Sequence, residues 1–193
     1  MDSSLDVILS VLVGVGLSAA CGFRVFVPLM VISIASKTAH LALAPGFEWM
    51  GSWPALVAFS VATALEITAY YVPWLDNLLD SIATPAAIVA GIIVTAACVG
   101  DVSPFLKWTL AVIAGGGAAA GVQTVTVVAR GASTATTGGI ANWIVTTAEN
   151  AGAAVVSALA VFVPLVAIAA IVVIMAVLGW RILCRRAAPM PAA

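Results

Sequence analysis

The sequence predicts an all-α membrane protein, a polytopic transmembrane helical bundle of about five spans. Of its 193 residues, 64% are apolar and 8% are charged, and the mean hydropathy is +1.22. Soluble domains carry about 25% charged and about 45–50% apolar residues, and a chain of this size still exposes about 30% of its unfolded surface after folding. Lipid is therefore the solvent that fits this composition.

The first apolar run predicts one long span over residues 7–36. A helix needs about 20 apolar residues to cross the hydrocarbon, so this longer run, which Arg24 and Pro28 interrupt, is expected to be tilted or bent. Residues 1–20 contain no Lys or Arg. Because a signal peptide starts with a basic region, we expect a retained membrane helix here.

The second and third spans are predicted over residues 54–72 and 81–99. Pro73 and Trp74 break the chain between them. Pro85 would then lie in the first turn of the third span, where a missing N–H group is tolerated.

The fourth span is predicted over residues 105–129, and a polar connector over 131–141 follows it. The fifth apolar region, 142–183, is too long for one simple crossing. Either Pro164 kinks it, or its first part, 142–156, is a half-helix that enters the membrane before the true span. If the region splits, the chain has six spans.

Lys and Arg are expected to concentrate on the cytoplasmic side of the membrane. Five spans with the N-terminus outside leave only Arg130 on the outer side. The basic residues placed inside are Lys37, Lys107, Arg181, Arg185 and Arg186. This orientation is favoured, with a single transmembrane domain over residues 1–184 and a short disordered cytoplasmic tail over 185–193. Six spans with both ends inside are the alternative.

Ionisable residues at membrane depth are the main candidates for a functional site, because burying each one costs about 2.5–3.5 kcal/mol on insertion scales. The candidates are Arg24, Glu66, Asp76, Asp80 and Glu149. In one interpretation the carboxylates bind a cation or relay a proton, and Arg24 sets the local field. In the other, Arg24 pairs with Glu66 or Asp80 as an internal tie, and Asp76 caps a helix at the interface.

Small residues indicate close packing of helices, because they let backbones approach one another. The glycines assigned to packing are Gly16, Gly22, Gly115, Gly117 and Gly121. Gly117 and Gly121 form a GxxxG pattern. The glycine run from Gly115 could instead loosen its helix and expose carbonyl groups to an ion or substrate.

A weak internal repeat relates residues 16–24 to 115–123 and residues 76–84 to 142–150. In a five-span bundle the first pair would be antiparallel, as in inverted-repeat transporters. The second pair of segments would agree with such an inverted repeat only if residues 142–156 form a re-entrant segment. A coincidence of small residues is the alternative.

Composition and motifs exclude several classes of function. The net charge of −1 offers no basic surface for nucleic acid. The chain has one histidine and three cysteines, without the ligand spacings that metal sites need. The hydroxyl-rich connector lacks the Gly-Lys-[Ser/Thr] ending of a Walker motif. We therefore expect no metal and no cofactor. Enzymatic activity is not expected either, because one loop histidine and the lack of clustered carboxylates leave few candidates for general acid–base chemistry; a membrane-embedded lipid enzyme is the alternative.

The chain resembles a known family through segments that follow in order. They are Gly16-Leu-Ser-Ala-Ala-Cys-Gly-Phe-Arg24, Glu66, Val72-Pro-Trp-Leu-Asp76-Asn-Leu-Leu-Asp80 and Thr136-Thr-Gly-Gly-Ile-Ala-Asn142. Together they resemble the uncharacterised bacterial membrane family known as domain of unknown function 4126. Members of that family often have Asn-Pro and Glu-Asp where this chain has Asn142-Trp143 and Glu149-Asn150. The resemblance implies a bacterial inner-membrane location and supplies no biochemical activity.

The function expected from these residues is a small inner-membrane channel or transporter for an ion (a proton or a cation) or a small solute. Five spans are few for a solitary transporter, so a homo-oligomer packed through Gly117 and Gly121 is expected in contact with membrane lipids. The alternative is a non-transporting membrane protein that binds a lipid or another apolar ligand, or that scaffolds a membrane complex.

Overall fold

The computed structural model describes residues 3–100, 102–164, 166, 172–173, 175–177 and 180; for residues 3, 4, 73, 74, 76–78 and 80 it describes the backbone alone. Over these residues the chain is helical, with seven α-helices, one 3₁₀ helix and one π-helix, and without a β-strand. The predicted all-α helical bundle is confirmed.

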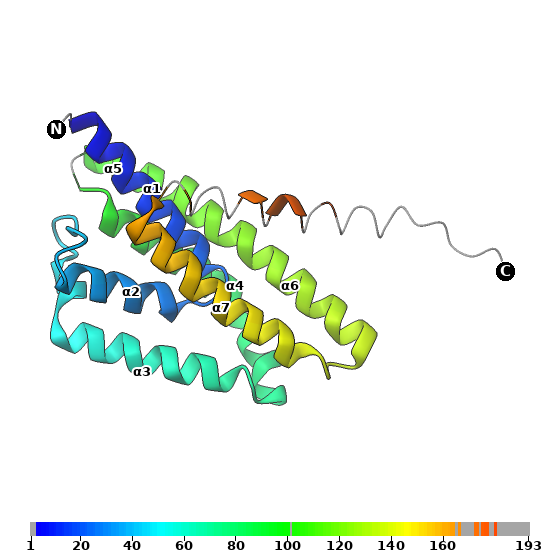
Figure 1. Cartoon of the computed structure of the whole chain (residues 1–193). Coiled ribbons are helices and arrows are strands. Elements are labelled where there is room, and N and C mark those ends of the chain that lie inside the picture. Colours follow the sequence, from blue (N-terminus) through cyan, green and yellow to red (C-terminus); the bar gives the residue numbers. More distant parts are fainter. Residues whose placement is uncertain are drawn as a thin grey trace.

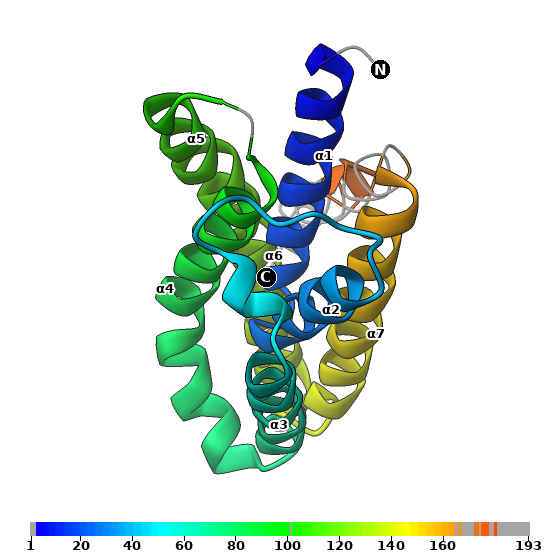
Figure 2. The same cartoon turned by 90° about the vertical axis from the view of Figure 1, so that its left-hand side faces the viewer.

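Four long helices form the core of the bundle (Figure 1). They are α1 (Ser3–Cys21), α4 (Pro73–Cys98), α6 (Gly117–Thr137) and α7 (Asn142–Phe162). The helix α6 continues directly from α5 (Pro104–Leu110) through the π-helix η2 (Ala111–Gly116). Helices α1 and α6 run in one direction and α4 and α7 in the other (Figure 1). Figure 2 shows α1 between α4 and α7, and α1 contacts both of these helices.

Two shorter helices, α2 (Phe26–Lys37) and α3 (Trp53–Ala69), pack beside this core. The 3₁₀ helix η1 (Glu48–Gly51) precedes α3. The end of α2 meets the start of α3, where Lys37 Nζ donates to the Gly51 carbonyl at 3.3 Å. The start of α2 meets the end of α3, at Glu66. The two helices are therefore antiparallel.

The predicted single span over residues 7–36 is wrong, because the chain reverses at residues 22–25. Helix α1 ends at Cys21, and α2 then runs back in the direction of α7. Arg24 lies beside the first turns of α7, whereas the ring of His40 lies 5.5 Å from that of Phe162 at its end. A break exposes backbone N–H groups, which apolar surroundings cannot satisfy. The carboxylate of Glu66 accepts these hydrogen bonds and so permits the reversal.

Other predicted boundaries also shift. Helix α4 begins at Pro73, a favourable first residue of a helix, so Pro85 lies inside α4 and not in its first turn. Helix α6 extends to Thr137 through most of the predicted connector. Helix α7 is one continuous helix of 21 residues that ends at Phe162, beside Pro164, so the half-helix alternative is wrong. The predicted tail, 185–193, lies outside the described residues.

Three helices are long and apolar enough to cross a membrane, by length and composition. They cover Ser81–Cys98, Pro104–Thr137 and Asn142–Phe162. Three shorter apolar helices accompany them, at Leu5–Cys21, Phe26–Lys37 and Trp53–Ala69. These helices are typical of an integral membrane protein.

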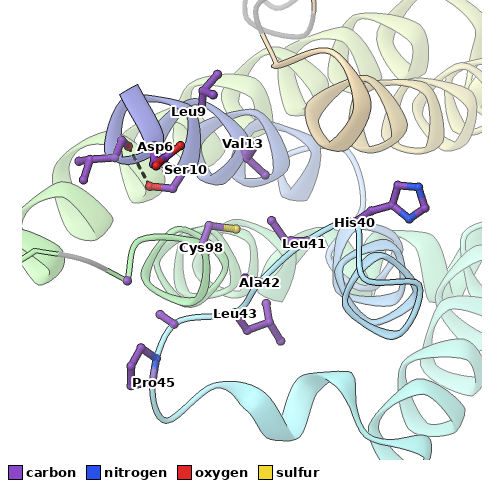
Figure 3. Close-up of a pocket in the computed structure, with 13 residues that line it drawn as sticks. Asp6, Leu9, Ser10, Val13, His40, Leu41, Ala42, Leu43, Pro45 and Cys98 are labelled. Atoms are coloured by element: carbon purple, nitrogen blue, oxygen red, sulfur yellow. Dashed lines mark hydrogen bonds between the residues drawn. The ribbon is translucent and has the colours of Figure 1, made fainter. Parts of the chain in front are cut away.

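One end of the bundle gathers the start of α1, the loop after α2 and the end of α4. They surround a cavity of about 460 Å³, to which Asp6, Leu41 and Cys98 contribute. Figure 3 shows these three segments around it, with the ring of His40 directed away from Asp6. Lys107 belongs to the same end, because its ammonium lies 4.8 Å from the centre of the Phe47 ring.

This end of the bundle contradicts one premise of the predicted outside N-terminus, and the orientation itself stays a prediction. That prediction required the start of α1 and Lys37 to lie on opposite sides of the membrane. The cavity instead places the start of α1 beside the loop that follows Lys37. The reversal at residues 22–25 is the reason, because it adds a change of direction that the apolar run does not reveal.

The first pair of repeat segments, 16–24 and 115–123, lies side by side and parallel, not antiparallel as predicted. A Cβ added to Gly22, the residue that follows α1, would lie 2.6 Å from the Ala119 carbonyl and the Val122 Cβ of α6. A Cβ added to Gly115 would lie 2.7 Å from the Gly91 carbonyl of α4. Side chains cannot fit at either contact, so α1, α4 and α6 approach through these glycines.

The other glycines assigned to packing have different surroundings. Gly16 is buried. A Cβ added to Gly117 would meet nothing within 4 Å. One added to Gly121 would be in ordinary contact with Met175 Cε, at 3.7 Å. The GxxxG pattern therefore lies on an open face of α6 at Gly117.

Candidate functional site

Three charged side chains from three parts of the chain meet inside the bundle. Arg24 lies in the turn between α1 and α2, Arg130 in α6 and Glu149 in α7. The Arg24 Nη1 atom lies 2.9 Å from the Glu149 Oε2 atom, and the Arg130 Nη2 atom also contacts that oxygen. Arg24 is only 2% exposed and Glu149 only 5%. This charge cluster is thus removed from solvent.

An aromatic ring joins the two guanidinium groups. The Arg24 Cζ atom lies 3.9 Å from the centre of the Tyr70 ring, and the Arg130 Cζ atom lies 4.8 Å from it. Tyr70, which follows the end of α3, is itself buried. A cation over an aromatic face gains about 0.5–2 kcal/mol, with the larger values in desolvated sites. Tyr70 therefore stabilises two like charges that would otherwise repel each other.

Hydrogen bonds fix the orientation of both arginines. The Nε atom of Arg24 donates to Asn150 Oδ1 at 2.6 Å, and its Nη1 donates to the Phe23 carbonyl at 3.1 Å. The Nη1 atom of Arg130 donates to Thr146 Oγ1 at 3.3 Å. Thr146, Glu149 and Asn150 share one face of α7 at helical spacing, so this single helix supplies a polar partner to each of the two arginines.

A chain of polar groups leads from the charge cluster to the surface. Asn150 Nδ2 donates to the Tyr71 hydroxyl at 3.5 Å, and this hydroxyl lies 3.0 Å from Thr147 Oγ1. Tyr71 is 46% exposed, and Thr147 is exposed as well. The cluster is therefore connected to the outer face of the bundle between the end of α3 and the start of α7.

Glu66 has a different task from the one expected of an ion-pair partner. Its Oε1 atom accepts from the Val25 N–H at 2.8 Å, and its Oε2 atom accepts from the Phe26 N–H at 3.0 Å. The carboxylate thus caps the N-terminus of α2, where the helix dipole favours negative charge. Arg24 pairs with Glu149, which the predicted tie did not include. Glu66 bonds backbone N–H groups instead, and the tie to Asp80 stays a prediction because that side chain lies outside the described residues.

The structure places the remaining predicted residues only in part. Asp76 and Asp80 lie in the first turns of α4, and their side chains fall outside the described part of the chain. Among the described residues, no group of three His, Cys, Asp or Glu side chains could hold a metal ion.

Sequence reasoning missed three members of the site. Arg130 was assigned to the outer end of a span, but it lies about two turns before the end of α6. Tyr70 and Asn150 were not among the predicted candidates. The spacing of Asn150 behind Thr146 and Glu149 was the available signal for its place on the inner face of α7.

A family model, the Domain of unknown function (DUF4126), matches residues 11–185 of the chain. No curated protein and no solved structure matches the chain.

Proposed function

The chain belongs to this family of unknown function, and we propose that it is a small channel or transporter of the bacterial inner membrane for an ion or a small polar solute. The observation that carries the proposal is the convergence of Arg24 and Arg130 on the carboxylate of Glu149 inside an apolar helical bundle.

The energetic cost of the charge cluster supports this proposal. Each ionisable side chain at the centre of a membrane helix costs about 2.5–3.5 kcal/mol, and such residues commonly mark ion or substrate pathways. The cluster also adjoins the break between α1 and α2. Broken helices beside a binding site are a recurrent feature of transporters, because the free ends of the two halves face the substrate.

In the proposed mechanism Glu149 is the group that a proton or cation meets. A carboxylate shared by two guanidinium groups is held in one position, and the arriving ion would compete with Arg24 and Arg130 for its oxygens. Glu66 would keep the break open by holding the start of α2. Asp76 and Asp80 would extend the polar path along α4.

Flux measurements on proteoliposomes test the proposal. Wild-type protein should carry protons, Na⁺ or K⁺ faster than protein-free liposomes do, and Glu149→Gln should abolish that flux. Glu48→Gln is the matched control, because Glu48 is exposed and bonds only the Gly46 N–H among the described contacts. Equal flux in wild type and Glu149→Gln, or no flux of any tested ion above empty liposomes, would refute it.

A second candidate is a non-transporting membrane protein that holds a lipid or scaffolds a complex. The observation that favours it is the dense bonding of Arg24, whose guanidinium contacts Glu149, Asn150 and the Phe23 carbonyl. Such a network can serve as a tie between helices. In that case Glu149→Gln lowers stability, and wild-type protein carries no flux.

A further inference from the structure

An apolar groove of about 530 Å³ opens on the side of the bundle between α3 and α4, with α2 at its base. Phe59 of α3, Leu29 of α2 and Pro85 of α4 line it. Its volume lies within the 300–1,000 Å³ of small-molecule sites in proteins. Side chains at its edge, Ile82 and Val89, are 60% and 54% exposed. The groove is therefore open to the surroundings of the bundle at this edge.

The length of the groove matches one leaflet of a bilayer. Its wall on α4 extends from Ile82 to Ile93, a distance of about 16 Å at 1.5 Å per residue. The hydrocarbon core is about 30 Å thick, so one leaflet measures about 15 Å. An extended acyl chain of a single leaflet therefore has the length that the groove accommodates.

A positive charge, that of Lys37, lies next to one end of the groove. The turn η1 closes this end with Trp49 and Met50. The Lys37 ammonium lies 3.3 Å from the carbonyl of Gly51 in the same turn and 4.0 Å from the centre of the Trp53 ring. Trp side chains favour the membrane–water interface. The ammonium is thus held where the phosphate of a lipid would lie if its chain occupied the groove.

We propose that this groove is a binding site for one anionic phospholipid, with an acyl chain between α3 and α4 and the phosphate beside Lys37. The opposite end of the groove reaches Val25, whose N–H the Glu66 carboxylate holds. The bound chain would therefore support the reversal between α1 and α2 from the lipid side. The site is independent of the charge cluster and of ion transport.

Native mass spectrometry on protein taken from bilayers of equal phosphatidylglycerol and phosphatidylethanolamine tests the proposal. Wild type should retain one phosphatidylglycerol, with about a fivefold preference, the effect expected of one basic residue near the membrane surface. Lys37→Gln should remove the preference, whereas Lys107→Gln should keep it. Ala86→Phe and Val89→Phe, which fill the groove, should each abolish retention, whereas Ala154→Phe on the exposed face of α7 should not.

Three outcomes would overturn the proposal. The first is retention of phosphatidylglycerol by both groove-filling variants at the wild-type level. The second is an unchanged lipid preference in Lys37→Gln. The third is a retained mass that corresponds to a free fatty acid, a neutral lipid or a second copy of the chain. Because Lys37 is half-buried at the end of α2 and does not line the groove, the result of Lys37→Gln holds even if a groove-filling variant fails to fold.

Discussion

Arg24 and Glu149 form an ion pair of 2.9 Å in which both side chains are buried. The pair joins the turn between α1 and α2 to the second turn of α7. It therefore fixes the point at which the chain reverses against a helix from the other end of the sequence. A contact of this kind explains how a polar turn can remain inside an apolar bundle.

The coupling between these two residues is the first prediction. A double-mutant cycle with Arg24→Gln and Glu149→Gln should give a coupling energy of about 1–3 kcal/mol, since residues in one buried ion-pair network are not additive. The free energy of unfolding in detergent, measured by SDS titration, provides the values. Additive single effects would show that the pair contributes nothing to stability.

Removal of the Glu149 side chain should lower the free energy of unfolding by more than its substitution with Gln does. Glu149→Ala leaves Arg24 and Arg130 without this partner, and breaking a buried ion pair typically costs about 3–5 kcal/mol. The same SDS titration should show this loss, while Glu48→Ala in the exposed loop should stay near wild type. A loss below about 1 kcal/mol, the value of an exposed ion pair, would contradict the burial of the cluster.

The cap on α2 gives a prediction with a local measurement. Glu66→Ala removes the acceptor for the N–H groups of Val25 and Phe26. The loss of an N-terminal cap costs about 0.5–2 kcal/mol, and hydrogen exchange at the start of α2 should accelerate accordingly. Glu66→Gln keeps one carbonyl acceptor, so its effect should be smaller. Unchanged exchange in Glu66→Ala would show that other groups hold the reversal.

Two glycine substitutions distinguish the effect of helix packing on stability from the effect of helix propensity. Gly22→Ala places a Cβ 2.6 Å from the Ala119 carbonyl and should destabilise the bundle by about 1–3 kcal/mol, the usual cost of overpacking. Gly117→Ala meets open space, so it should be neutral or stabilise α6 by up to about 1 kcal/mol. Thermal unfolding of both variants provides the comparison, and equal effects would contradict the close approach of α1 and α6.

The fold class followed from composition, but the path of the chain did not. Hydropathy locates apolar runs. The predicted runs coincide with α3, α4, α6 and α7, although the boundaries of these helices differ from the predicted ones. Hydropathy could not locate the reversal at residues 22–25, because the residues of α1 and α2 are equally apolar. The reversal depends on Glu66, whose carboxylate comes from a distant part of the sequence.

The candidate site was predictable in type and only partly in membership. The cost of a buried charge drew attention to Arg24, Glu66 and Glu149. The pairing depends on the reversal, which brings Arg24 to Glu149 of α7 while Glu66 of α3 holds the neighbouring backbone N–H groups. Arg130 was missed for a related reason, since α6 continues through a segment whose Ser, Thr and Gly residues indicated a loop.

The last prediction concerns the sides of the membrane. In a chain without its native cysteines, Leu5→Cys and Thr38→Cys should react with a membrane-impermeant thiol reagent from the same side, because the start of α1 and the end of α2 share one end of the bundle. Thr136→Cys, near the end of α6, should react from the opposite side. The original five-span prediction requires Leu5→Cys and Thr38→Cys to react from opposite sides. That result would mean that α1 and α2 form one span and that the Arg24–Glu149 pair does not fix a reversal. Labelling of both cysteines from one side would support the reversal and would identify the side of the membrane on which Lys37 and Lys107 lie.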